Sequence, residues 1–270
     1  MKLKEILYGM GLKPRAREYP FEVDTFRLPK EGELQFARWQ HPNERRKEFS
    51  QPAIDALREF LKPGDTAIDV GGHTGDTALP VALALGPTGC VFALEPNRYV
   101  YKVLLANSAL NRRKANILPL NFAATPQDAE LEFEYSDPGF CNGGLHEGID
   151  RWRHTHFFKL KVTGKNLLNY LKTEFPAELE KVRYIKIDTE GSDRSVVASL
   201  KELVQRKRPY IKSEIYQHLP ADQRFLYYED LRNLGYAVHK FNNDEDYRGV
   251  RLERDDMTKW EHYDIFAVPE

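Results

Sequence analysis

Residues 66–76 read TAIDVGGHTGD, a short apolar run that ends in an acid and two glycines before a helical pattern begins. This order predicts a buried strand, a tight turn and a helix that starts near Asp76. We expect Gly71 and Gly72 to let the backbone approach a ligand, and Gly75 to let the helix begin close to the strand. The stretch therefore indicates an α/β domain with a ligand site at a strand tip.

A second apolar run, residues 90–94, ends in Glu95, Pro96 and Asn97. An acid at the tip of the second strand of a βαβ unit is placed to accept hydrogen bonds from ribose hydroxyls. The sequence thus predicts a site for an adenosine-bearing cofactor. The alternative is an ordinary strand–turn–helix in some other α/β domain.

The residue types at the strand tips separate the possible cofactors. The loop carries His73 two positions after Gly71, where a dinucleotide pattern needs its second glycine, and it has no phosphate-binding lysine. Carboxylates stand near three strand tips, at Asp69, Glu95 and Asp188. Such a set repels a pyrophosphate but suits a cationic sulfonium with its ammonium group. We therefore expect S-adenosylmethionine (SAM) rather than NAD or ATP.

Three blocks resemble the FkbM-like family of SAM-dependent methyltransferases. They read AIDVGGHTG at 67–75, FALEPN at 92–97 and YIKIDTEG at 184–191, with Asn107 to Asn111 between the last two. The resemblance covers about residues 50 to 215, and the block at 184–191 is the most specific. It implies the class I methyltransferase fold, a Rossmann-like and mostly parallel sheet with helices on both faces and an antiparallel last strand. It also implies O-methylation of a sugar or secondary-metabolite hydroxyl.

The cofactor contacts that we expect come from the strand tips and from this resemblance. In this fold the turn at Ala123 packs on the adenine ring, where a small side chain leaves room. The expected cofactor-binding residues are Asp69, Gly71, Gly72, His73, Thr74, Gly75, Glu95, Pro96, Asn97, Ala123 and Asp188.

Transfer of a methyl group to an alcohol needs a base, because a neutral hydroxyl is a poor nucleophile. Lys186 and Asp188 share one face of the strand at 182–187. A lysine inside a buried strand must be paired, so we expect Lys186 to pair with Asp188 or with Glu214 on the next strand. A purely structural ion-pair network remains the alternative.

The general base is expected just beyond a strand tip. His218 follows the predicted strand at 209–215, and its ordinary pKa suits proton transfer at cellular pH. Glu190 is the rival, since it follows Asp188 closely, and a surface turn is the alternative for the histidine. A metal site from His146, His154, His156 and Asp188 has no diagnostic spacing, so we favour metal-independent catalysis.

The chain divides into an N-terminal extension, 1–49, and a methyltransferase domain, 50–270. In the extension we expect a hairpin near 26–39. The extension either covers the cofactor or the acceptor, or it lies on the surface without such a role. A glycine-rich insertion at about 137–156 predicts an acceptor-binding lid. Alternating apolar and charged residues predict a strand at 130–135 before the insertion and its antiparallel partner at 157–162 after it. Helices are expected at 164–173, capped by Thr163, and through 196–208.

Composition excludes several classes. The 270 residues carry a net charge of −1, which gives no electrostatic case for nucleic acid as partner. The apolar patch at 6–12 is broken by Gly9 and Gly11, so we expect neither a signal peptide nor a membrane span, and a cytoplasmic location. The expected partner is a small-molecule or glycan hydroxyl acceptor. Alternatives are N-methylation of an amine and a non-catalytic SAM- or NAD-binding module.

Overall fold

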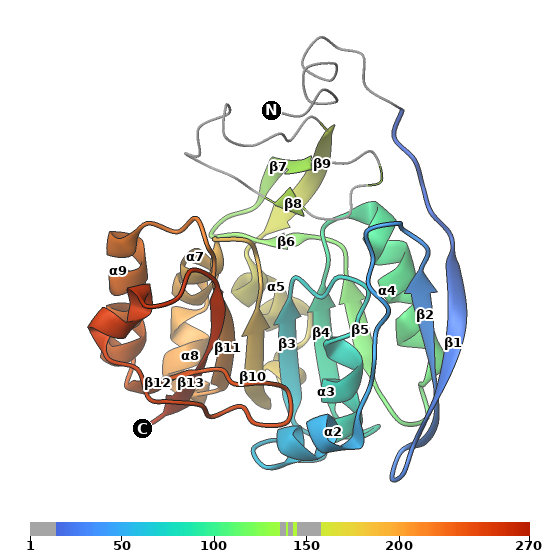
Figure 1. The fold of residues 1–270 in the computed structure, drawn as a ribbon, viewed down its shortest axis with the longest axis horizontal. Coiled ribbons are helices and arrows are strands. Elements are labelled where there is room, and N and C mark those ends of the chain that lie inside the picture. The colour runs from blue at the N-terminus through green and yellow to red at the C-terminus, as the bar shows by residue number, and fades with distance from the viewer. Residues whose placement is uncertain (1–14, 136–138, 140–142, 145–157) are drawn as a thin grey trace.

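The computed structural model describes residues 15–135, 139, 143–144 and 158–270. Within these residues a seven-stranded sheet forms the centre of the molecule (Figure 1). Its strand order is β12 (Tyr236–Lys240), β13 (Tyr263–Pro269), β11 (Tyr210–Ile215), β10 (Val182–Ile187), β3 (Thr66–Val70), β4 (Cys90–Leu94) and β5 (Ile117–Leu120).

The sheet is parallel from β11 to β5, and the last strand, β13, lies antiparallel between β11 and β12. This order and this single reversed strand are those of the class I methyltransferase fold. The prediction of a Rossmann-like sheet with an antiparallel last strand is confirmed. Because β3 to β11 run the same way, their carboxyl ends meet at one edge, where ligands of open α/β sheets bind.

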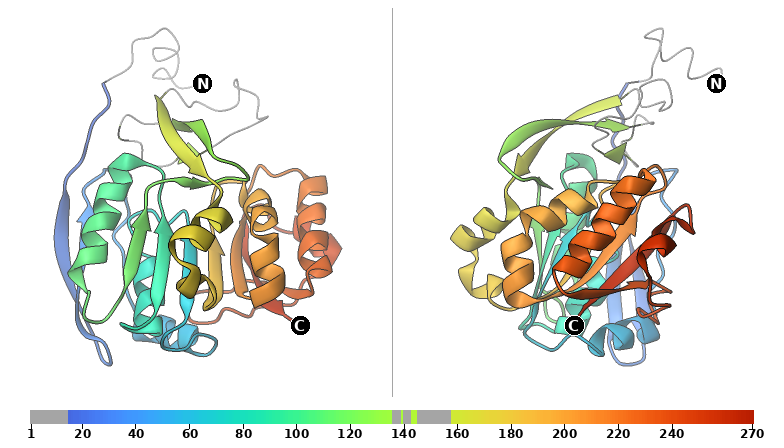
Figure 2. Two further views of the ribbon diagram at one scale, coloured as in Figure 1. Left: turned by 180° about the vertical axis from the view of Figure 1, so that it is seen from behind. Right: turned by 90° about the vertical axis from the view of Figure 1, so that its left-hand side faces the viewer.

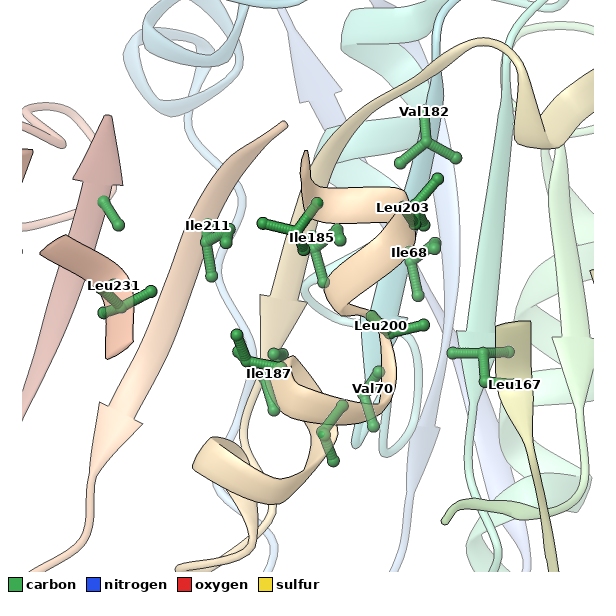
Figure 3. Packing of buried hydrophobic residues seen from close by; sticks show 14 of the residues in the cluster. Ile68, Val70, Leu167, Val182, Ile185, Ile187, Leu200, Leu203, Ile211 and Leu231 are labelled. Carbon is green, nitrogen blue, oxygen red and sulfur yellow. The ribbon is translucent and has the colours of Figure 1, made fainter. Parts of the chain in front are cut away.

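Helices cover both faces of the sheet (Figure 2). Ile185, Ile187 and Ile211 pack against Leu200 and Leu203 on one face (Figure 3). The elements of that face are α5 (Leu167–Glu174), α6 (Pro176–Leu179), α7 (Asp193–Ser199), α8 (Lys201–Lys207) and α9 (Ala221–Asn233), with the 3-10 helix η1 (Arg254–Thr258) contributing Met257 to the same cluster.

The opposite face carries α2 (Gln51–Arg58), α3 (Ala78–Leu85), α4 (Arg98–Leu110) and a hairpin of β1 (Phe21–Leu28) and β2 (Gly32–Trp39). The hairpin expected near 26–39 is therefore present, and it begins five residues earlier. Its strand β2 contacts α4, so the N-terminal segment belongs to the same packed body (Figure 1).

A smaller sheet lies beyond the carboxyl ends of the central strands (Figure 1). It contains β6 (Ala123–Ala124), β9 (Phe158–Lys165), β7 (Ala129–Tyr135) and β8 (Gly143–Gly144). The alternation of apolar and charged residues predicted β7 and its antiparallel partner, and the pairing of Leu131 with Val162 confirms it.

Two expected helix boundaries are wrong. Thr163 does not cap a helix, because β9 continues through Gly164, which pairs with Ala129. The helix α5 starts later, and Asn166 caps it by accepting a hydrogen bond from the Asn169 N–H at 2.9 Å. The helix expected through 196–208 is two helices, α7 and α8, because the backbone leaves helical geometry at the buried Leu200.

Two asparagines join α4 to the hairpin. The Asn107 side chain accepts a hydrogen bond from the Ala37 N–H at 2.6 Å and donates to the Ala37 carbonyl at 3.0 Å. One helical turn later, Asn111 pairs in the same way with both backbone groups of Gln35. Asn107 also donates to the carbonyl of Thr74 at 2.7 Å. Side chains of α4 thereby supply hydrogen-bond partners to backbone groups on the unpaired edge of β2. The Asn107 amide also anchors the glycine loop through Thr74.

Replacement of Asn107 by Ala should lower the free energy of unfolding by about 2–4 kcal/mol, because three buried backbone groups lose their partner. The measurement is equilibrium denaturation, with Asn169→Ala as control, since Asn169 is exposed on α5. A loss no larger than that of the control would contradict the anchoring role of Asn107.

Candidate cofactor and acceptor site

A cavity of about 430 Å³ lies at the carboxyl ends of β3, β4 and β10. Loop residues after these strands form its floor, and Leu131, Phe133 and Tyr135 of β7 line it from the smaller sheet. Its size suits a nucleoside-sized ligand. The apolar face of β7 was visible in the sequence, but nothing in the sequence showed that this face lines a cavity.

The buried Lys186 holds the floor together. Its ammonium group lies 3.2 Å from Asp69 Oδ1 and 3.5 Å from Asp188 Oδ2, and it donates to the carbonyl of Gly71 at 2.9 Å. The contact with Asp69 is an ion pair rather than a hydrogen bond, since Oδ1 has no hydrogen-bond partner. Burial alone would lower the pKa of Lys186, but Asp69 and Asp188 outweigh it and raise that pKa.

The expected partners of Lys186 were partly right. Asp188 is a partner, whereas Glu214 is not, because it lies farther along β11 and Lys186 is in register with Lys212. The missed partner is Asp69, which is in register with Lys186 on β3. Asp69 is buried, accepts a hydrogen bond from Thr77 at 2.6 Å and does not line this cavity. It supports the glycine loop indirectly, through its contacts with Lys186 and Thr77.

The glycines of the loop serve packing more than ligand access. A Cβ on Gly71, at φ +81°, would lie 2.1 Å from the Asp188 carbonyl oxygen, so the two strand tips could not meet. A Cβ on Gly75 would lie 2.9 Å from Leu104 of α4. Of the expected loop contacts, Gly71 and His73 line the cavity. Gly72, Thr74 and Gly75 do not line it among the described residues.

Glu95 is the acid at the tip of β4. It is buried, lines the cavity and accepts a hydrogen bond from the Asn97 N–H at 2.8 Å. Burial raises its pKa to about 7, against the backbone hydrogen bonds from Asn97 and His73 that favour the carboxylate. Asn97 in turn caps α4 by accepting from the Tyr99 N–H at 3.0 Å. The carboxylate is therefore held still at the cavity wall beside Pro96.

The next strand tip gives an apolar wall. Phe122, Ala123 and Ala124 follow β5 and line the cavity together with Thr125. The expected turn at Ala123 is the two-residue strand β6, which pairs with β9. Phe133 of β7 lines the same cavity, and we call the part of the cavity lined by the small side chains of Ala123 and Ala124 the slot.

Glu190 stands at the opposite end of the cavity with Asp188. Its backbone is left-handed, with φ +54°, which is rare for a residue with a side chain. Burial, and then the neighbouring Asp188 and Asp193, raise the pKa of Glu190 to about 7. Asp193 fixes this turn because it accepts hydrogen bonds from both the backbone N–H and the hydroxyl of Thr189.

Two other expected catalytic residues lie away from this cavity. Glu214 is buried beside His262, whose Nε2 lies 3.3 Å from its Oε1, and neither side chain lines the cavity. Burial and four nearby carboxylates raise the pKa of Glu214 to about 9. His218 is exposed after β11, with its ring edge-on to Tyr216 at 5.3 Å between centroids.

Residues before α2 also line the cavity, although no motif in the sequence points to these positions. Asn43, Glu44, Arg45 and Lys47 line the cavity. Lys47 forms ion pairs with Glu44 at 3.0 Å and with Asp76 at 2.9 Å. Opposite charges 29 positions apart in sequence carry no pattern from which this pairing could be inferred.

No group of three or more metal-ligating side chains occurs among the described residues. The histidines 146, 154 and 156 and nearly all of the expected lid at 137–156 lie outside those residues. No helix in the described part of the chain is long and apolar enough to cross a membrane.

The cavity fits an adenosyl cofactor that carries a sulfonium. A buried carboxylate at Glu95 is suited to accept from ribose hydroxyls, and the slot at Ala123 is suited to adenine. Asp188, half exposed toward the cavity, provides negative charge for a cation. Fold and site together thus define the class of SAM-dependent methyltransferases.

Comparison with known protein families agrees with this class. The model of the methyltransferase FkbM domain matches residues 69–248, and the chain therefore belongs to the FkbM methyltransferase family, whose cofactor is SAM. The predicted family and cofactor are confirmed. No curated protein matches the chain in sequence.

Solved structures show similar folds at low identity. Methyltransferase FkbM from Methylobacillus flagellatus KT is 13% identical with a TM-score of 0.44, and the match covers 76% of this chain and 44% of that one. Fibrillarin from Aeropyrum pernix, with natively bound SAM, is 15% identical with a TM-score of 0.42, covering 94% and 97%. A SAM-dependent O-methyltransferase from Thermotoga maritima is 14% identical with a TM-score of 0.41, covering 93% and 78%.

Glu95→Gln should weaken binding of S-adenosylhomocysteine (SAH) about ten- to a hundredfold, because an amide replaces a carboxylate that we expect to accept hydrogen bonds from the two ribose hydroxyls. The raised pKa of Glu95 makes the carboxylate predominant only above about pH 7. The dissociation constant of the unmodified protein should therefore rise as pH falls below about 7. Calorimetry at pH 6 and 8 measures both effects.

The matched control is Glu59→Gln, at an exposed site at the end of α2. If Glu95→Gln binds SAH as tightly as this control, and if pH has no effect in the unmodified protein, Glu95 does not hold the ribose.

Proposed function

We propose that the protein transfers a methyl group from SAM to a hydroxyl oxygen of a sugar, a glycan or a secondary metabolite. The observation that carries this proposal is Glu190, a carboxyl group with a pKa of about 7 at the wall of the cofactor cavity. A base with a pKa near the working pH is suited to take a hydroxyl proton. Methylation of an amine needs such a base less.

Each residue of the site then has one task. Glu95 binds the ribose of the cofactor, and Asp188 balances its positive charge. The cofactor supplies an electrophilic methyl group. Glu190 accepts the proton of the acceptor hydroxyl, and its fixed left-handed backbone keeps the carboxylate at the cavity wall. Lys186 is a positioning residue, since it holds the two strand tips and Gly71 in place.

His218 is a weaker candidate for the base. It is exposed and does not line the cavity in the described residues, whereas Glu190 does. Glu214 has a raised pKa as well, but it lies behind the wall beside His262.

We also propose that the N-terminal extension, 1–49, covers the cofactor or the acceptor of the methyltransferase domain, 50–270; residues 1–14 of the extension lie outside the described part of the chain. The contribution of Glu44, Arg45 and Lys47 to the cavity supports this role. For the insertion at 137–156 we keep the proposal of an acceptor-binding lid. The strand that leads into it, β7, lines the cavity.

Glu190→Gln should lower kcat by about a hundredfold or more, because general-base assistance is lost while the side-chain shape is kept. In the unmodified enzyme at saturating SAM, where cofactor binding no longer limits the rate, kcat/KM for the acceptor should rise with pH and level off above about 7, since Glu190 must be ionised. Glu190→Gln should lose this rise of kcat/KM with pH, the pH limb. SAH affinity, measured in parallel, should stay within about twofold of the unmodified protein. A variant that keeps both full turnover and the pH limb contradicts the role of Glu190.

The acceptor is tested with labelled SAM and a panel of sugars, hydroxylated metabolites and their amino analogues. Label in hydroxyl compounds supports the proposal. Label only in amino analogues indicates an N-methyltransferase instead. SAH binding with no transfer to any acceptor indicates a binding module.

A further inference from the structure

The cofactor lies in a defined direction along the strand tips if the proposed function is right. The adenine slot is at the end of β5, the ribose acid Glu95 at the end of β4, and Gly71 and Asp188 at the ends of β3 and β10. Since these strands are neighbours in that order, the amino-acid part of the cofactor lies over β3 and β10. That part carries a carboxylate as well as an ammonium group.

This end of the cavity is acidic. The lining acids there are Glu44, Asp76, Asp188 and Glu190. A ligand carboxylate placed among them needs a cation or backbone donors. The backbone N–H groups of Gly71 and Gly72 are not available, because both donate to the carbonyl of Leu94, at 3.1 and 2.8 Å.

The described lining contains three lysine or arginine side chains, and two are already paired. Lys186 is held by Asp69 and Asp188, and Lys47 by Glu44 and Asp76. The third is Arg45. It is exposed, and its guanidinium makes no hydrogen bond or ion pair with any described residue. Arginine presents a planar fork that fits a carboxylate bidentately.

The backbone around Arg45 is held at the correct end of the cavity. Lys47 ties the segment to Asp76 of the glycine loop at 2.9 Å. Glu44 Oε2 lies 3.9 Å from Nε2 of His73, in the same loop. Arg45 therefore stands beside the loop that follows β3 and not beside the adenine slot. It also lies outside residues 69–248, which the family model matches.

We propose that Arg45, from the N-terminal segment, binds the carboxylate of the amino-acid part of the cofactor. This inference depends on the proposed function only for the identity of the cofactor. It makes the segment before α2 part of the cofactor site, and it separates the cofactor from adenosine compounds that lack the amino acid.

The test measures dissociation constants by calorimetry for SAH and for 5′-methylthioadenosine, which lacks the amino-acid part. Arg45→Met should raise the SAH constant about ten- to a hundredfold and leave that of methylthioadenosine unchanged. Arg45→Lys should restore part of the affinity, since it keeps the charge but loses the fork. The matched control is Arg46→Met. Arg46 is exposed and adjacent but does not line the cavity, so its replacement should change neither constant.

Three outcomes overturn the inference. In the first, Arg45→Met binds SAH within twofold of the unmodified protein. In the second, it weakens both ligands equally. In the third, it raises the KM of an acceptor without changing SAH affinity, which would assign Arg45 to the acceptor. If the unmodified protein binds neither SAM nor SAH, the proposed function itself fails. If it binds them and only the effect of Arg45→Met is absent, the inference about Arg45 fails alone.

Discussion

The site depends on one buried cation among carboxylates. Lys186 lies near the carboxyl end of β10 and contacts Asp69, Asp188 and the carbonyl of Gly71, so it joins the tips of β3 and β10 to the glycine loop. Without it, Asp69 would be a buried charge with no counter-ion, which is costly in a low-dielectric interior. The close meeting of the strand tips at Gly71 is possible because this position lacks a Cβ. The ion pair and the glycine therefore fix one geometry together.

Because Lys186 neutralises Asp69, the other acids at the strand tips are the ones that line the cavity and can contact a ligand. Glu95 lines the cavity at the tip of β4, where we expect the ribose, while Asp188 and Glu190 stand at the end where a positive charge and a reacting hydroxyl are expected. The pKa values of Glu95 and Glu190 are both raised to about 7, chiefly by burial. Each carboxyl group thus changes charge near neutral pH, which is typical of functional sites. Cofactor binding through Glu95 and proton transfer through Glu190 should therefore both depend on pH near 7, because burial in the cavity raises both pKa values.

The sequence predicted the parts whose signals are local. The apolar runs ending in Asp69, Glu95 and Asp188 placed three strand tips correctly, and alternation predicted β7 and β9. It failed where a residue's role depends on a distant partner. The Lys186–Asp69 register joins positions 117 residues apart, and the approach of 43–47 to the cavity follows from pairing with Asp76 and His73. The end of β9 was misplaced because Thr163 suggested a helix cap, although the strand continues and Gly164 pairs with Ala129. Asn107 was visible as part of a family block, but its bonds to β2 required the fold.

The most direct test of this account is a double-mutant cycle between Asp69→Asn and Lys186→Met, measured as the free energy of unfolding. Lys186→Met alone should cost about 3–5 kcal/mol, because it leaves the buried Asp69 carboxylate uncompensated. The double variant should lose much less than the sum of the single losses, with a coupling energy of about 2 kcal/mol or more. A coupling energy below about 0.5 kcal/mol, with the two losses simply adding, would contradict the claim that this ion pair holds the site together.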